Sequence, residues 1–181
     1  MKKQDNLKYA LIAAALPWAV FALNLAVPIE LRNYGIRPRI VDGLWGIPFA
    51  PLLHLNITHL IANTSALFIL MLVALSFSLK LTRLALVAII ALGGGLVWLW
   101  GQSGTVHIGA SGVIFGLLGF LMFVGVFRKE WLALILSLVI FFLYGGALLS
   151  LFMHTPGISW AGHFFGFISG VNAAWWTRKA R

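Results

Sequence analysis

The sequence predicts an all-α membrane protein, a bundle of six transmembrane helices, and three observations support this fold class. Of the 181 residues, 61% are hydrophobic and only 9% are charged, whereas a soluble domain carries about 25% charged residues. The hydrophobic residues form long runs, and a helix needs about 20 of them to cross the apolar core of a bilayer. The Lys and Arg residues lie at the ends of these runs. We expect a single domain over residues 1–181, with spans at about 8–28, 56–79, 84–100, 111–127, 131–152 and 160–177.

The basic residues predict how the helices are oriented. A net charge of +9 would suggest a nucleic acid partner in a soluble protein, but here the positions of Lys and Arg are better explained by the membrane, and we expect no nucleic acid. With the N-terminus inside, ten of the thirteen basic residues are cytoplasmic and three are external: Arg32, Arg37 and Arg39. Cytoplasmic loops carry an excess of Lys and Arg. We therefore expect both termini in the cytoplasm. Six spans agree with this, because an even number returns the chain to the side on which it starts.

Two connections between the spans are unusual. Residues 29–55 form a long first external loop that is rich in proline, leucine and aromatic residues, so we expect it to pack against the bundle or lie in the outer membrane interface. Residues 101–110 are polar but uncharged. Non-helical backbone at membrane depth is tolerated only where protein or a water-filled cavity satisfies it. We expect this second loop to dip below the outer surface, so that Ser111 begins its helix inside the membrane.

The acidic residues exclude several classes of protein. All four lie outside the predicted spans: Asp5, Glu30, Asp42 and Glu130. An intramembrane aspartyl protease needs two carboxylates within the bilayer, and a proton-coupled transporter usually carries an acidic relay there. There is no His-Glu-x-x-His helix for a metalloprotease and no cysteine for thiol catalysis. We expect neither a metal nor another cofactor.

Four polar residues at membrane depth are candidates for function, because such residues are costly in a span. They are His59 and Asn63 in the second span, Ser111 in the fourth and His163 in the sixth. A single polar residue near the end of a span is usually an interfacial side chain or a helix–helix hydrogen bond. These four share one depth on the outer side, and His59 and Asn63 face the same way on one helix.

The residue types suit acyl transfer. A serine hydroxyl needs an adjacent base, which a neutral imidazole can supply. The tetrahedral intermediate needs donors for its oxyanion, such as an amide, an imidazole or the N–H groups at a helix N-terminus. Without a carboxylate in the spans, the arrangement would be a Ser–His dyad rather than a triad.

Glycines accompany both members of this dyad. Ser111 lies in Gly109-Ala110-Ser111-Gly112, and small residues follow at Gly116 and, in the sixth span after His163, at Gly166 and Gly170. Small residues at this spacing let helices approach closely. Gly145 and Gly146 lie in the outer half of the fifth span. They either allow close packing or let that helix bend to open a lateral gate.

These motifs resemble those of the rhomboid family of intramembrane serine proteases. The family pattern is Gly-x-Ser-Gly at the start of the fourth span, His-x-x-Gly-x-x-x-Gly in the sixth and His-x-x-x-Asn in the second, with a further histidine matched by His54. The resemblance covers nearly the whole chain and implies a compact six-span bundle with a membrane-lying first loop. It implies Ser111 as nucleophile and His163 as general base. The implied oxyanion hole is His59, Asn63 and the Ser111 backbone N–H, supported by Gly109, Gly112, Phe115, Gly166, Gly170 and His54.

Two positions depart from the family pattern. Members often have a Trp-Arg pair in the first loop, whereas here Trp45 is followed by Gly46, and the aromatic residue four after the serine is often Tyr and here is Phe115. Phe115 could still stack under His163. His107 and His154 match no motif and receive no role.

The resemblance implies a multi-pass protein of the bacterial inner membrane that cleaves single-span transmembrane substrates near the outer face. The alternative is an inactive relative that binds transmembrane clients without cleaving them. Relatives of that kind lose the serine or the histidine, and this chain keeps both. Oligomeric state and substrate identity do not follow from the sequence.

Overall fold

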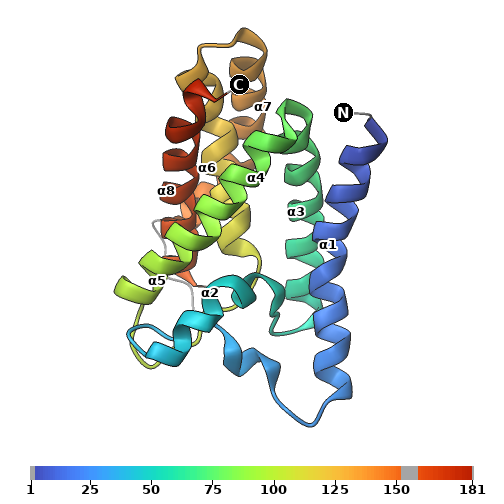
Figure 1. Cartoon of the computed structure of the whole chain (residues 1–181), viewed down its shortest axis with the longest axis vertical. Coiled ribbons are helices and arrows are strands. Elements are labelled where there is room, and N and C mark those ends of the chain that lie inside the picture. Colours follow the sequence, from blue (N-terminus) through green and yellow to red (C-terminus); the bar gives the residue numbers. More distant parts are fainter. Residues whose placement is uncertain (1–2, 152–158, 181) are drawn as a thin grey trace.

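The computed structural model describes residues 3–151 and 159–180, and within these residues the fold is all-helical (Figure 1). No strand is present in the described part of the chain, where the single β-type contact is a bridge between Ile36 and His107. The long helices run roughly along one axis. They are α1 (Lys3–Ala26), α3 (Ile57–Phe77), α4 (Leu79–Ala88) continuing into α5 (Gly94–Trp100), α6 (Ser111–Arg128), α7 (Trp131–Tyr144) and α8 (Trp160–Trp176).

Five helical segments of the described chain are long and apolar enough to cross a membrane. They are Gln4–Ala26, Ile57–Phe77, Leu79–Trp100, Ser111–Arg128 and Trp131–Leu151. The helix predicted as the sixth span, α8, has 17 residues, at the lower limit of what spans a bilayer. The all-helical prediction is thereby confirmed for the described residues, while the count of six spans stays a prediction.

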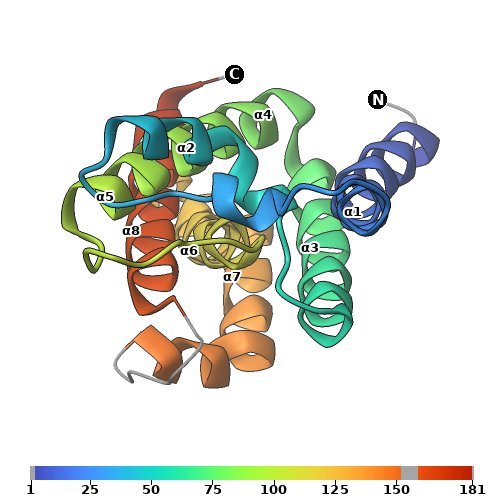
Figure 2. The same ribbon diagram turned by 90° about the horizontal axis from the view of Figure 1, so that it is seen from below.

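Helix α6 forms the centre of the bundle. Its side chains Leu117, Leu118 and Phe120 are completely buried, and Figure 2 shows α3, α4, α7 and α8 arranged around it. Helix α1 lies outside α3, to which Trp18 is tied by a 3.1 Å hydrogen bond from its indole to the Thr64 hydroxyl. Between its first residue, Ser111, and its last, Arg128, α6 carries no polar side chain, as its central position requires.

The glycines predicted to bring α6 and α8 together do so. A Cβ added to Gly166 would collide with the carbonyl oxygen of Gly112, and one added to Gly170 with that of Gly116. Only hydrogen fits at these positions because the two backbones are in contact, as expected for small residues between membrane helices. The contact places the N-terminal turns of α6 and α8, and therefore Ser111 and His163, at the same level.

The third span differs from its prediction of 84–100. Its helix begins earlier, at Leu79, because the Ser78 hydroxyl caps it by accepting from the Leu81 N–H. Between α4 and α5 it contains a π-helical turn, η4 (Ile89–Gly93), where Ile89 packs against Gly116. Such turns are uncommon and often lie near functional sites.

The fifth span also differs from the predicted continuous helix. The α-helix ends at Tyr144, and residues Gly145–Leu151 form a 3-10 segment, η5. Within the described residues, a Cβ added to Gly145 or Gly146 would meet nothing within 4 Å. Close packing is therefore not the reason for these glycines in the described structure. The two glycines lie where the α-helix changes to a 3-10 helix. Position 152 of the predicted span and His154 lie outside the described residues.

The first loop packs against the end of the bundle at which α6 begins. It contains short helical segments at Leu31–Tyr34, Val41–Trp45, α2 (Gly46–Phe49) and Ala50–Leu52. Arg39 fastens it: its backbone N–H donates to Trp98 O at 2.9 Å, and its guanidinium donates to Leu99 O at 2.7 Å and Gly101 O at 3.0 Å. Trp45, in contrast, is 70% exposed. Figure 1 shows α2 at the end of the bundle opposite the one where α1 begins and α8 ends.

Candidate active site

An open cavity of about 1130 Å³ lies between α3, residues 101–110, α6 and α8. The four polar residues predicted at one depth all line it: His59, Asn63, Ser111 and His163. They come from three helices and are separated by up to about a hundred positions in the sequence. The fold therefore brings together, at one end of the bundle, every side chain that the sequence proposed for the chemistry.

Ser111 is the first residue of α6, and the backbone before it is held in an unusual conformation. Gly109 has φ +108°, which residues with a Cβ rarely adopt. Its N–H donates to Ala50 O at 2.9 Å, so the first loop supports the turn. Ala110 precedes the helix without a side-chain cap. The first N–H groups of α6, that of Ser111 included, thus have no intrahelical acceptor and can bind an anionic ligand.

His163 lies in the first turn of α8 with its ring held on one face by Phe115. The two rings stack with centroids 4.1 Å apart and an interplanar angle of 14°, so the phenylalanine performs the stacking that was expected of this position. The His163 backbone N–H donates to Ser159 O at 3.1 Å. Among the described contacts, His163 and Ser111 make no direct hydrogen bond; the ring instead contacts the Ser150 hydroxyl, 3.1 Å from Nδ1. Catalytic hydrogen bonds are often loose without substrate.

His59 and Asn63 converge on the backbone beside Ser111. A Cβ placed on Gly109 would lie 3.0 Å from His59 Nε2 and 3.4 Å from Asn63 Nδ2. The Asn63 amide is buried, yet its Nδ2 has no hydrogen-bond partner in the described structure. A buried donor without a partner is costly and calls for an explanation. An anionic oxygen bound beside Gly109 during a reaction would supply the missing acceptor.

His54 contacts the backbone of the turn that precedes Ser111. Its Nδ1 lies 3.3 Å from Leu52 O, and its Nε2 accepts from the Ala110 N–H at 3.4 Å. These partners require a neutral ring with the proton on Nδ1. Burial lowers the pKa of His54 to about 4, which keeps it neutral at physiological pH. The resemblance gave His54 only a supporting place, and the structure shows the contact through which it can support Ser111.

The sequence assigned no role to His107, yet the structure places it beside the site. Its Nδ1 lies 2.6 Å from the hydroxyl of Ser159, which caps α8 by accepting from the Gly162 N–H at 3.0 Å. Its backbone pairs with that of Ile36 through two hydrogen bonds of 2.9 and 3.0 Å. Burial lowers the pKa of His107. His107 lies in the polar, uncharged loop directly before the proposed nucleophile. That position was the signal from which a place beside the site could have been predicted.

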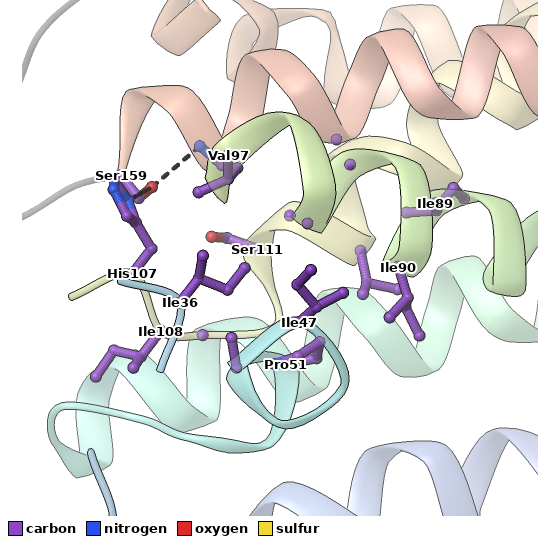
Figure 3. Close-up of a pocket in the computed structure, with 18 residues that line it drawn as sticks. Ile36, Ile47, Pro51, Ile89, Ile90, Val97, His107, Ile108, Ser111 and Ser159 are labelled. Carbon is purple, nitrogen blue, oxygen red and sulfur yellow. Dashed lines mark hydrogen bonds between the residues drawn. The ribbon is translucent and has the colours of Figure 1, made fainter. Parts of the chain in front are cut away.

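His107, Ser159 and Ser111 border a second, small cavity of about 50 Å³ (Figure 3). Its other walls are apolar side chains of the first loop and of the third span, among them Ile36, Ile47 and Ile89. Ser111, His107 and Ser159 line both this small cavity and the large open one.

The carboxylates are all elsewhere. Glu30 pairs with Arg32 at 2.5 Å, Glu130 with Arg128 at 2.8 Å, and Asp42 lies 3.8 Å from Arg37. None lines either cavity. The arrangement that remains is a hydroxyl at a helix N-terminus, a buried imidazole at the same level and several hydrogen-bond donors beside them. It suits nucleophilic attack on a carbonyl carbon.

Comparison with known proteins agrees with this geometry. A family model described as "Rhomboid domain" matches residues 41–180, which includes every residue of the candidate site. The chain belongs to the rhomboid family. A Bacillus subtilis protein named "Putative rhomboid protease YdcA" is 32% identical over 176 residues, covering 90% of this chain and 83% of that protein.

Two mycobacterial relatives are more similar in sequence. An uncharacterized protein of Mycobacterium tuberculosis is 44% identical over 185 residues, covering 92% of this chain and 75% of the relative. One of Mycobacterium leprae is 41% identical over 174 residues, covering 89% of this chain and 67% of the relative. Membership of the rhomboid family makes the chain a multi-pass integral membrane protein and supports protease activity at the level of the family.

Proposed function

We propose that this rhomboid is an intramembrane serine endopeptidase with Ser111 as nucleophile and His163 as general base. The observation that carries the proposal is the convergence of Ser111, His163, His59 and Asn63, from three helices, on one cavity. Gly112 and Gly166 bring the two helices of the dyad into contact, and Phe115 holds the imidazole ring. No carboxylate takes part.

The proposed reaction has two halves. Ser111 Oγ attacks the scissile carbonyl carbon while His163 accepts the hydroxyl proton. The oxyanion that forms is stabilised by the Ser111 N–H, the Asn63 amide and His59. Collapse breaks the peptide bond, and His163 returns the proton to the leaving amine. A water molecule then attacks the ester carbon while His163 accepts its proton. When the acyl–oxygen bond breaks, His163 gives that proton to Ser111 Oγ, which releases the second product and restores both side chains.

We further propose that the substrates are single-span transmembrane proteins cleaved near the outer face of a bacterial inner membrane. The excess of Lys and Arg on one side supports cytoplasmic termini. The start of α1 and the end of α8 lie at the same end of the bundle. The cavity is lined by residues near the starts of α3, α6 and α8, and these helices start at the opposite end of the bundle. With α8 as a sixth span, this arrangement opens the site toward the outside.

Purified protein incubated with an artificial single-span substrate tests the proposal. We expect a cleavage product with the wild type and none with Ser111→Ala or His163→Ala, and labelling by a fluorophosphonate probe that requires Ser111. Ser76→Ala is the matched control, because Ser76 lies at the far end of α3, where its hydroxyl donates to Val73 O. This control should cleave and label as the wild type does.

Cleavage that persists in purified Ser111→Ala protein would overturn the assignment. If neither wild type nor Ser111→Ala cleaves, and both bind the substrate equally, the chain is instead the inactive client-binding relative.

A further inference from the structure

The two ring nitrogens of His163 have different surroundings, and one of them faces a serine that no sequence motif marks. Ser150 Oγ lies 3.1 Å from His163 Nδ1. The same hydroxyl donates its hydrogen to Ala147 O at 2.7 Å. A hydroxyl has one hydrogen and two acceptor lone pairs. In the arrangement in which that hydrogen points to Ala147 O, Ser150 Oγ accepts from His163 and Nδ1 carries the proton.

We propose that Ser150 is a positioning residue that sets the tautomer and orientation of His163. This inference rests on the proposed function, in which His163 is the base. A neutral imidazole protonated on Nδ1 has its lone pair on Nε2, the nitrogen left free to accept the Ser111 proton. In a Ser-His-Asp triad a carboxylate performs this orienting task. Here a hydroxyl, itself oriented by a backbone carbonyl, takes that place.

One further contact holds the segment that carries Ser150, and another holds the His163 ring. The neighbouring Leu151 is buried, and its carbonyl oxygen accepts a hydrogen bond from the Trp160 indole in the first turn of α8. The end of η5 is thereby fastened to the helix that carries His163. Phe115 restricts the ring from one face, and Ser150 restricts rotation within the plane of the ring. Together the stacking and the polar contact hold the imidazole ring in one orientation.

The 3-10 winding of η5 is what brings the hydroxyl to the ring. A 3-10 helix turns about 120° per residue and an α-helix about 100°. Over the six steps from Tyr144 to Ser150, the difference amounts to roughly 120°. Had the α-helix continued past Tyr144, Ser150 would point to another side of the segment.

The alternative role for Ser150 is local: a helical serine that only bonds the carbonyl three residues back. Ser76 makes such a bond to Val73 O at 2.7 Å and has no second partner in the described structure. The two serines therefore form a matched pair. If the hydroxyl matters only for its own turn, their alanine variants should behave alike.

The decisive measurement is the tautomer of His163, read from ¹⁵N chemical shifts of histidine-labelled protein above pH 8. The chain has five histidines, and His163→Ala assigns the signal. We expect Nδ1–H in the wild type and in Ser150→Thr, and a shift toward Nε2–H or a mixture in Ser150→Val. Threonine and valine have the same shape and differ only in the hydroxyl.

Removal of the Ser150 hydroxyl should also have a small effect on kcat. Ser150→Val should lower kcat for the artificial substrate about 2- to 10-fold, the worth of one neutral hydrogen bond, with KM unchanged. Ser150→Thr should restore most of the loss, and Ser76→Ala should match the wild type.

An unchanged His163 tautomer together with unchanged kcat in Ser150→Val would overturn the inference. Equal losses in Ser150→Val and Ser150→Thr, with the tautomer as in the wild type, would also overturn it, because the hydroxyl would then be irrelevant. Failure of the proposed function looks different: no Ser111-dependent cleavage by the wild type. The ¹⁵N spectrum reports on Ser150 in either case, because it requires no activity.

Discussion

At the scale of single residues, the unpartnered Asn63 amide leads to the first prediction. If it donates to the oxyanion, Asn63→Ala should lower kcat without abolishing activity. Losing one such donor costs on the order of 100- to 1000-fold in serine hydrolases. We expect a smaller loss, because His59 and the Ser111 N–H remain beside Gly109. Cleavage rates of the purified variants measure the effect.

The control for this prediction is Asn172→Ala, on α8, whose amide donates to Ile168 O at 3.0 Å. It should cleave as the wild type does. A loss in Asn63→Ala as complete as that in Ser111→Ala, with both variants folded, would contradict this division of roles.

The buried histidines outside the spans predict how stability depends on pH. Burial lowers the pKa of His54 to about 4 in the folded protein, against about 6.5 in an unfolded chain. Between these values the unfolded state binds more protons, so acid favours unfolding. The contribution of His54 is complete above pH 6.5 and is lost as the pH falls to about 4. The lowered pKa of His107 acts in the same direction.

Thermal unfolding midpoints in detergent between pH 8 and 4 test this dependence. We expect a falling midpoint over the acid half of the range and a shallower fall in His54→Gln, which cannot ionise. Glu30 affects only the acid end of the scan, because its hydrogen bond to Arg32 lowers its pKa from 4.5 to about 2 and its contribution begins to be lost only below about pH 4.5. Equal slopes in the wild type and His54→Gln would show that His54 is not the group responsible.

At the scale of elements, the change from α7 to η5 leads to the third prediction. Alanine favours an α-helix over glycine by about 1 kcal/mol per residue, and the described surroundings leave room for both methyl groups. The double variant Gly145→Ala, Gly146→Ala should extend α7 and turn Ser150 away from His163. We expect slower cleavage of the membrane substrate and slower labelling by the small fluorophosphonate probe.

The lateral-gate hypothesis gives a different result for the same variant. If the glycines serve only to let the outer part of the fifth span bend aside, cleavage of the membrane substrate should fall while labelling by the soluble probe stays unchanged. Gly95→Ala is the control, since it also adds a methyl group in open space, within α5. It should change neither reaction.

At the scale of the whole molecule, orientation in the membrane leads to the last prediction. The chain has no cysteine. A single introduced cysteine is therefore the one thiol in the protein, and its labelling shows on which side of the membrane it lies. Tyr34 is 57% exposed in the first loop, and Lys80 lies near the start of α4. In intact cells, a membrane-impermeant maleimide should label Tyr34→Cys. It should label Lys80→Cys only after the membrane is permeabilised, and the reverse pattern would show that the site faces the cytoplasm.

Much of the molecule was predictable because its signals are local. Runs of apolar residues predict helices, and the small residues Gly166 and Gly170 predict close contact between two spans, which the structure confirms. The rhomboid family was recognisable from three short motifs, and the family comparison confirms it. The roles of Ser111, His163, His59 and Asn63 remain predictions.

Other features depend on tertiary structure. The π-turn at Ile89–Gly93, the 3-10 segment after Tyr144 and the anchoring of the first loop by Arg39 have no signature that separates them from ordinary helix and loop. Ser150 and Ser159 are single serines in unremarkable surroundings. Whether such a hydroxyl reaches His163 or His107 depends on how each helix is rotated about its axis.

The sequence by itself thus determined the class of protein, its family and the residues available for catalysis. Composition, periodicity and glycine spacing act over a few turns of chain and can be read in order. Only the tertiary structure decided which neighbours orient those residues. The rotation of each helix about its axis is set by contacts of α6 with α8 and of α8 with η5, and the local sequence of one helix does not contain it.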